Sequence, residues 1–167
     1  MLGLGSCFDI IEGFAPVDLQ TAANNGDYVS LANAGHVAVV FQSGLGTAGD
    51  DPTLTIQQAS DNAGTGAKAL NFTTIYRKQA ATSLAATSAW TKTTQTAANT
   101  YTNATSAEQD ALWVVEFDAD QLDVDGGFDY IRATVADIGA NPQPGVLLYI
   151  LSELRHKTLP ADVVSAL

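Results

Sequence analysis

Short alternations of polar and apolar residues, separated by turn residues, restrict the fold of this chain more than any other feature. Runs of four to nine residues, rich in β-branched and aromatic side chains, are each bounded by Gly, Asn, Asp or Pro. A period of two places one face of a strand in the core, and the bounding residues favour turns. The pattern therefore predicts antiparallel strands rather than helices. The predicted strands are 28–31, 35–41, 53–58, 68–76, 90–96, 112–119, 128–137 and 146–151.

The strands near the C-terminus carry the clearest burial pattern. In 112–119, Trp113, Val115 and Phe117 share one face, while the other face changes from apolar to acidic, so only the first part of this strand is expected to be buried on both sides. The run 146–151 is apolar on both faces, which predicts a central strand. Seven or eight short strands with frequent turns favour an all-β fold, namely a single-domain antiparallel β-sandwich that is jelly-roll-like.

The length of 167 residues suits one domain that needs no disulfide or metal for stability. We assign 18–157 to the sandwich, 1–17 to an extended N-terminal arm and 158–167 to a C-terminal tail. The arm is apolar but holds no regular period, which leaves two alternatives open: a segment that docks on a neighbour, or an edge strand that closes the core. The stretch 107–111 is expected to form a short helical turn.

Composition narrows the class of partner. Hydrophobic residues make up 46% of the chain and charged residues only 15%, which indicates surface shared with other proteins. The net charge of −11 argues against direct binding of nucleic acid, which requires a basic face. No apolar run approaches the ~20 residues of a membrane span, so we expect no membrane partner.

The stretch Gly44–Gly49 spells G-x-G-x-x-G after an apolar run, a pattern that can cradle a pyrophosphate. That chemistry needs a helix after the glycines, because its N-terminus supplies the unpaired N–H groups. Here Asp50, Asp51 and Pro52 follow, and then a period-two run. We predict an exposed, anionic loop between two strands that binds no nucleotide.

An acidic segment is the only candidate for a cation site. The carboxylates within it are Glu116, Asp118, Asp120, Asp123, Asp125 and Asp129. Ca²⁺ prefers such oxygen ligands, but the EF-hand order fails, because Leu122 stands at the third ligand position and Asp129 replaces the final Glu. We interpret 125–127 as a solvated turn, with a non-EF calcium site as the alternative, and assign no metal-binding residue.

Catalytic patterns are missing from the sequence. His36 and His156 lie far apart in the chain, Cys7 is the only cysteine, and no G-x-S-x-G, H-E-x-x-H or C-x-x-C motif occurs. We therefore expect a protein that is not an enzyme, with no catalytic residue, no cofactor-binding residue and no cofactor.

The amino-acid sequences of several segments resemble those of a known family. These are NNGDYVSLANAGHVAVVF, GTAGDDPTLTIQQASDNAGTGAKALNFTTIYRKQ, ALWVVEFDADQLDVDGGFDYIRATVADIG and GVLLYILSELRH. From about Asp9 to His156 the chain resembles small virion structural proteins of tailed bacteriophages and prophages. The resemblance implies a non-enzymatic capsid decoration (cement) protein on the virion surface, assembled in the bacterial host cytoplasm. Its implied partners are the major capsid protein and copies of itself, as a homo-oligomer for which a trimer is one form.

Two other functions stay open. A tail or neck (head-tail connector) component also tolerates acidic, β-rich subunits, because a negative lumen lets DNA slide without sticking. A Ca-dependent carbohydrate-binding β-sandwich is the third alternative, and it would use the acidic segment.

Overall fold

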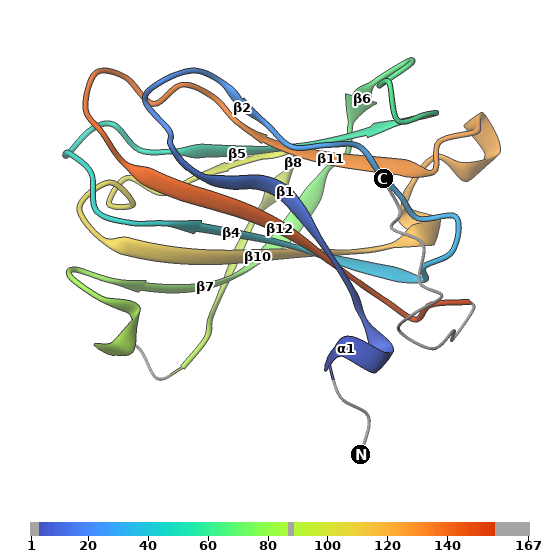
Figure 1. Cartoon of the computed structure of the whole chain (residues 1–167), viewed down its shortest axis with the longest axis horizontal. Helices are drawn as coiled ribbons and strands as arrows, with labels where there is room; N and C mark the ends of the chain where they lie inside the picture. The colour runs from blue at the N-terminus through green and yellow to red at the C-terminus, as the bar shows by residue number, and fades with distance from the viewer. Residues whose placement is uncertain (1–3, 87–88, 156–167) are drawn as a thin grey trace.

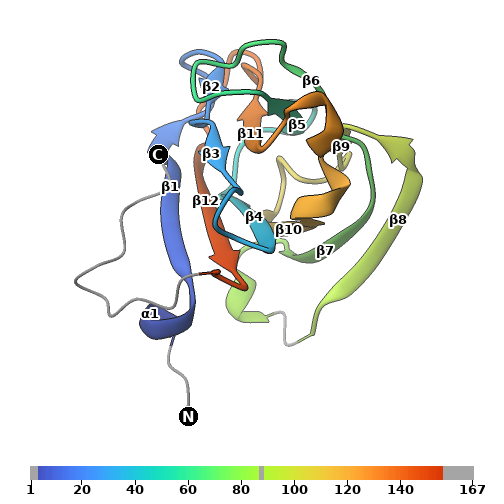
Figure 2. The same ribbon diagram turned by 90° about the vertical axis from the view of Figure 1, so that its right-hand side faces the viewer.

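The computed structural model describes residues 4–86 and 89–155, and they form two antiparallel six-strand sheets packed face to face (Figures 1 and 2). The first sheet has the order β1 (Asp9–Asp18), β12 (Pro144–Ser152), β4 (His36–Ser43), β10 (Asp110–Asp118), β7 (Phe72–Ala80) and β8 (Thr91–Ala98). The second has the order β2 (Asn24–Asn25), β11 (Tyr130–Val135), β5 (Thr53–Ala59) and β6 (Lys68–Ala69), while β3 (Val29–Ser30) pairs with β11 and β9 (Thr100–Thr102) with β5. Outside the strands are the short helix α1 (Leu4–Cys7) and the 3₁₀ turns η1 (Leu84–Ala86), η2 (Ala119–Gln121) and η3 (Val124–Gly126).

The all-β sandwich predicted from the alternation is confirmed, and each of the eight predicted strand regions overlaps an observed strand. The region 68–76 is divided, however, because β6 belongs to the second sheet and β7 to the first. The buried Leu70 lies between them, where the chain crosses from one sheet to the other. The strand order does not by itself assign the jelly-roll class, which stays a prediction.

The core consists of the inward residues of both sheets, and Trp113 is the largest fully buried side chain. From β10 its ring packs against Phe41 of β4, with 5.4 Å between centroids, and edge-on against Tyr101 of β9, at 4.8 Å. Since Tyr101 belongs to the second sheet, these aromatic contacts join the two layers. The predicted burial of Trp113, Val115 and Phe117 on one face is confirmed.

A polar contact also crosses the core. The Tyr149 hydroxyl, from β12, accepts a hydrogen bond from the Ala133 N–H of β11 at 2.8 Å and donates one to the Asp27 carbonyl at 3.1 Å. Burial raises the pKa of the Tyr149 phenol well above its ordinary value, so the hydroxyl keeps the proton that it donates. The two sheets are thereby fixed in register as well as in distance.

For the N-terminal segment, the structure decides between the two alternatives over 9–18. These residues form β1, the edge strand of the first sheet, which pairs with β12 from Asp9 opposite Leu151 to Asp18 opposite Pro144. Ile11 is buried, and a Cβ at Gly13 would lie 2.5 Å from the Leu147 side chain, so the strand closes the core rather than extending away from it. The sandwich thus begins at Asp9 and not at residue 18. Residues 1–3 and the predicted tail 158–167 lie outside the described residues.

The helical turn predicted at 107–111 is wrong. The segment bends, and β10 begins at Asp110. The reason is a long-range contact, because the Ala107 N–H and the Ser106 hydroxyl both donate to the Asp51 carboxylate at 2.9 Å. These bonds hold 106 and 107 against the loop after β4, while 110 and 111 pair with β7 and β4 instead of closing a local turn.

We expect Tyr149→Phe to destabilise the fold by about 1–3 kcal/mol, because it leaves the buried Ala133 N–H without its acceptor. Chemical denaturation measures the change in the free energy of unfolding. Tyr130→Phe, on the half-buried outward side of β11, is the control and should stay within about 0.5 kcal/mol of wild type. Equal effects of the two variants would contradict the role given to the Tyr149 hydroxyl.

Candidate functional site

The acidic segment lies at one end of the sandwich. An open cavity of about 570 Å³ lies beside it. The cavity is lined by Leu31, Ala32 and Arg155 and by four carboxylates of the segment, namely Asp120, Asp123, Asp125 and Asp129. The predicted turn at 125–127 is confirmed: η3 is followed by Gly127, whose φ of 81° is the left-handed conformation that glycine adopts readily.

The carboxylate of Asp123 serves the local fold. It forms an ion pair with Lys68 of β6 and accepts a hydrogen bond from the Gly126 N–H at 3.1 Å. The hydrogen bond from Lys68, followed by that from Gly126, lowers the pKa of this carboxyl below its ordinary value. The Lys68 ammonium also lies 3.9 Å from the centre of the Phe128 ring, which fixes β6 against the turn.

The calcium alternative finds no ligand set in this segment. Across 4–86 and 89–155, no three His, Cys, Asp or Glu side chains come together in a way that could hold a metal ion. Asp123 is, moreover, already paired with Lys68.

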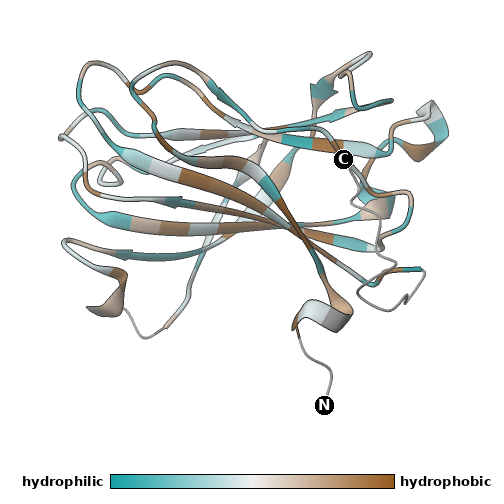
Figure 3. Ribbon diagram, viewed as in Figure 1, coloured by the Kyte–Doolittle hydropathy of each residue, from teal (hydrophilic) through white to brown (hydrophobic). Residues whose placement is uncertain are grey.

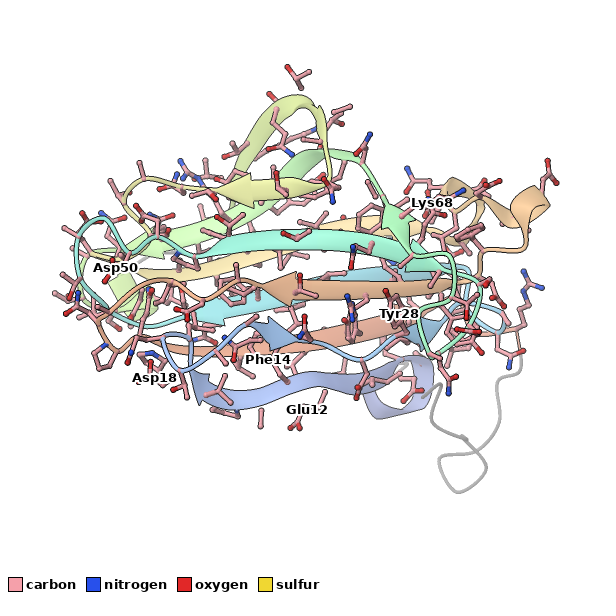
Figure 4. The ribbon with its side chains drawn as sticks, turned by 90° about the horizontal axis from the view of Figure 1, so that it is seen from above. Glu12, Phe14, Asp18, Tyr28, Asp50 and Lys68 are labelled. Atoms are coloured by element: carbon pink, nitrogen blue, oxygen red, sulfur yellow. The ribbon has the colours of Figure 1, made fainter. Side chains whose placement is uncertain are left out.

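The glycine-rich loop at the opposite end leads into a strand, as predicted, and Gly49 has a φ of 91°. It joins β4 of the first sheet to β5 of the second. The loop is exposed at 45 and 47–49, as predicted, but its two acids are half-buried and bonded: Asp51 accepts from 106 and 107, and Asp50 accepts from Asn141 Nδ2 at 2.7 Å. Figure 4 labels Asp50 at this end of the molecule. The loop therefore connects the two sheets and is held in place by these hydrogen bonds.

Gln143 also holds this loop in place, and it was not identified from the sequence. Its side chain is fully buried, and Nε2 donates to the carbonyls of Gly44 at 2.8 Å and Ser106 at 3.1 Å. Its backbone N–H donates to Asp18 Oδ1 at 3.1 Å. The position between two prolines, 142 and 144, marks only a loop in the sequence, because the partners lie in distant segments.

The histidines form no catalytic group in the described residues. His36 Nδ1 lies 3.1 Å from Ser152 Oγ, a contact between the paired strands β4 and β12. His156 lies outside the described residues. Among the described segments, no helix has the length and apolarity needed to cross a lipid bilayer.

The outer face of the first sheet is the most distinctive surface. We use this name for the outward residues of β1, β12, β4, β10, β7 and β8 between the two ends of the sheet. Its apolar and aromatic members are Ile10, Ala38, Val40, Tyr76, Leu112, Val114, Val146, Leu148 and Ile150. They alternate with the core residues and are half-buried, except Ile10, which is 45% exposed.

This outer face explains why 146–151 is apolar on both sides. The strand is internal, between β1 and β4, as predicted. One side faces the core, but the other faces outward, and no layer of strands or helices lies across it in the described chain (Figure 1). In Figure 3 the hydrophobic colour extends along β12 and its neighbours. An apolar sheet face without a covering layer is typical of a contact surface.

One corner of this face is more exposed than the rest. Leu4 of α1 is 56% exposed and Phe8, directly before β1, is 38% exposed. With Ile10 they form what we call the N-terminal corner. Within 4–17, the apolar residues noted in the sequence are thus divided between the edge strand, which buries Ile11, and the exposed Leu4, Phe8 and Ile10.

Comparison with known proteins gives no match, whether with protein-family models, curated proteins or solved structures.

Replacing Asp123 by Asn tests the role of the acidic turn. The lowered pKa means that the ionised carboxylate contributes stability above the ordinary Asp pKa of about 3.9, and that this contribution is lost as pH falls through the lower folded-state pKa. Asp123→Asn should therefore lower Tm slightly at neutral pH and match wild type in strong acid. Melting curves across pH measure this, with Asp125→Asn as the control. A Tm difference that persists in strong acid would contradict the role.

Proposed function

We propose that this chain is a non-enzymatic structural component of a tailed-phage particle that binds the outer capsid surface and stabilises contacts between capsid subunits. The observation that carries the proposal is the outer face of the first sheet, an apolar surface on a rigid sandwich. A protein that covers joints between subunits needs contact area and rigidity more than it needs reactive groups.

The distribution of charge supports the same function. A body with a net charge of −11 is repelled by packaged DNA at close range, which favours the outside of the shell. The resemblance of the sequence to small virion proteins points in the same direction.

We expect the protein to occur in many copies on tail-less heads. Quantitative mass spectrometry of purified heads and of isolated tails measures this distribution. Copies confined to tails would overturn the proposal in favour of a tail or neck component.

Adding the purified protein to heads that lack it should raise the Tm of the heads, because a ligand that binds only the assembled shell stabilises it by mass action. Leu148→Lys places a charge at the middle of the outer face and should abolish this shift. Val124→Lys changes an exposed apolar residue at the acidic end and is the control. Unchanged stabilisation of heads by Leu148→Lys would exclude the outer face as the capsid contact.

A further inference from the structure

The charges of this chain are separated along the sequence. Residues 62–107 contain no Asp or Glu, although they hold four of the seven Lys and Arg residues, namely Lys68, Arg77, Lys78 and Lys92. This segment includes β6, β7, β8 and β9, which lie at the same margin of the sandwich (Figure 2). A strongly acidic chain thus builds one of its margins from a segment that has no carboxylate.

Arg77 lies on the inward side of this margin. It is in register with Trp113 of β10 and with Thr91, the first residue of β8, so it is on the side of the sheet that faces the core. The loop 103–109, which connects β9 to β10, lies beside it. A cavity of about 210 Å³ remains there, and every residue that lines it is polar: Arg77, Gln79, Thr91, Asn103, Thr105 and Gln109.

The Arg77 guanidinium has no carboxylate partner among the described residues. The only ion pair between described side chains joins Lys68 to Asp123. Asp110 of β10 alternates with the buried Ala111 and therefore lies on the opposite side of the sheet from Arg77. Since the Arg77 side chain is half-buried, it has lost part of its hydration, and an anion that reaches it is bound more strongly than at a fully exposed position.

The cavity offers hydrogen-bond donors rather than acceptors. Asn103 Oδ1 accepts from Gln79 Nε2 at 3.1 Å and from the Thr105 hydroxyl at 2.9 Å. The Thr105 oxygen itself accepts from Gln79 Nε2 at 2.9 Å. These oxygens are thus already bonded within the wall of the cavity. In the described part of the chain, neither the Arg77 guanidinium nor Asn103 Nδ2 donates a hydrogen bond, so both are available to a ligand.

We propose that this cavity binds a carboxylate group, held by the Arg77 guanidinium with the Asn103 amide N–H beside it. The guanidinium presents two parallel N–H donors, which match the two oxygens of a carboxylate. One guanidinium also balances the single charge of a carboxylate, whereas a phosphate dianion would add uncompensated charge to a body of net charge −11. The volume equals that of about seven water molecules, which suits a carboxylate on a short stem.

The carboxylate can come from a small acid in solution or from an Asp or Glu side chain of a partner protein. The second source is sterically accessible, because β8 is the last strand of its sheet and pairs only with β7 among the described strands. An extended segment that lies along β8 can place one of its alternate side chains beside Thr91. The inference is independent of a role in a phage particle.

Titration of the ¹⁵N-labelled protein with sodium acetate, followed by NMR, tests the chemistry. The backbone amides of 77, 91, 103 and 105 should shift and saturate. Acetamide, which has nearly the same shape without the charge, and sodium chloride at equal ionic strength should not produce these shifts.

Three variants test the role of the guanidinium. Arg77→Gln should weaken acetate binding about tenfold, because it removes a charge-assisted pair of hydrogen bonds, and it should keep the wild-type Tm, because Arg77 forms no ion pair with the described residues. Arg77→Lys keeps the charge but loses the paired donors, so binding should weaken several-fold. Lys78→Gln removes the neighbouring cation on the opposite side of the sheet and is the control, with unchanged affinity.

A capped hexapeptide of alternating Glu and Thr, compared with its Gln and Thr counterpart, distinguishes the two sources. Tighter binding of the Glu peptide than of acetate would assign the carboxylate to a partner protein, and equal or weaker binding would assign it to a small acid. The proposal is overturned if neither acetate nor the Glu peptide gives saturable shifts, or if Arg77→Gln leaves the affinity unchanged. Inorganic phosphate that binds as tightly as acetate would overturn the assignment of a carboxylate.

Discussion

The contact between the inner faces of the two sheets is the interaction on which the rest of the structure depends. Trp113 lies in this contact and touches aromatic rings of both layers, while Tyr149 fixes the layers through hydrogen bonds to Ala133 and Asp27. Burial of the inward side chains supplies most of the favourable free energy, and the buried hydroxyl penalises any other register. One side of each strand faces the core. The side chains on the other side therefore form the surface that the molecule presents to partners.

The same alternation explains how much could be predicted. Strands with a regular period, such as β4, β10 and β12, are visible in the sequence because burial of one face leaves a local signature. Features that depend on distant partners are not visible. Asp51 has its partners at 106 and 107, and the chain leaves the second sheet at Leu70 although its composition does not change there. The strand β1 was ambiguous because register shifts after Glu12 and Phe14 interrupt its period.

Candidate sites were harder to predict than strands for a related reason. The acidic segment stands out in the sequence by its density of charge, but the structure uses Asp123 to fix a turn against Lys68. The outer face, by contrast, has no motif. Its signal in the sequence was that both sides of 146–151 are apolar, and this pattern was interpreted as burial of both sides. An apolar side chain opposite the core indicates either a covered strand or a contact surface, and only the arrangement of the layers distinguishes the two.

An apolar face on a strongly acidic body also has a physical consequence for specificity. A net charge of −11 keeps copies apart at long range, which opposes indiscriminate association through the apolar residues. Contact through the apolar face is therefore favoured only with a partner surface whose charge does not add to this repulsion.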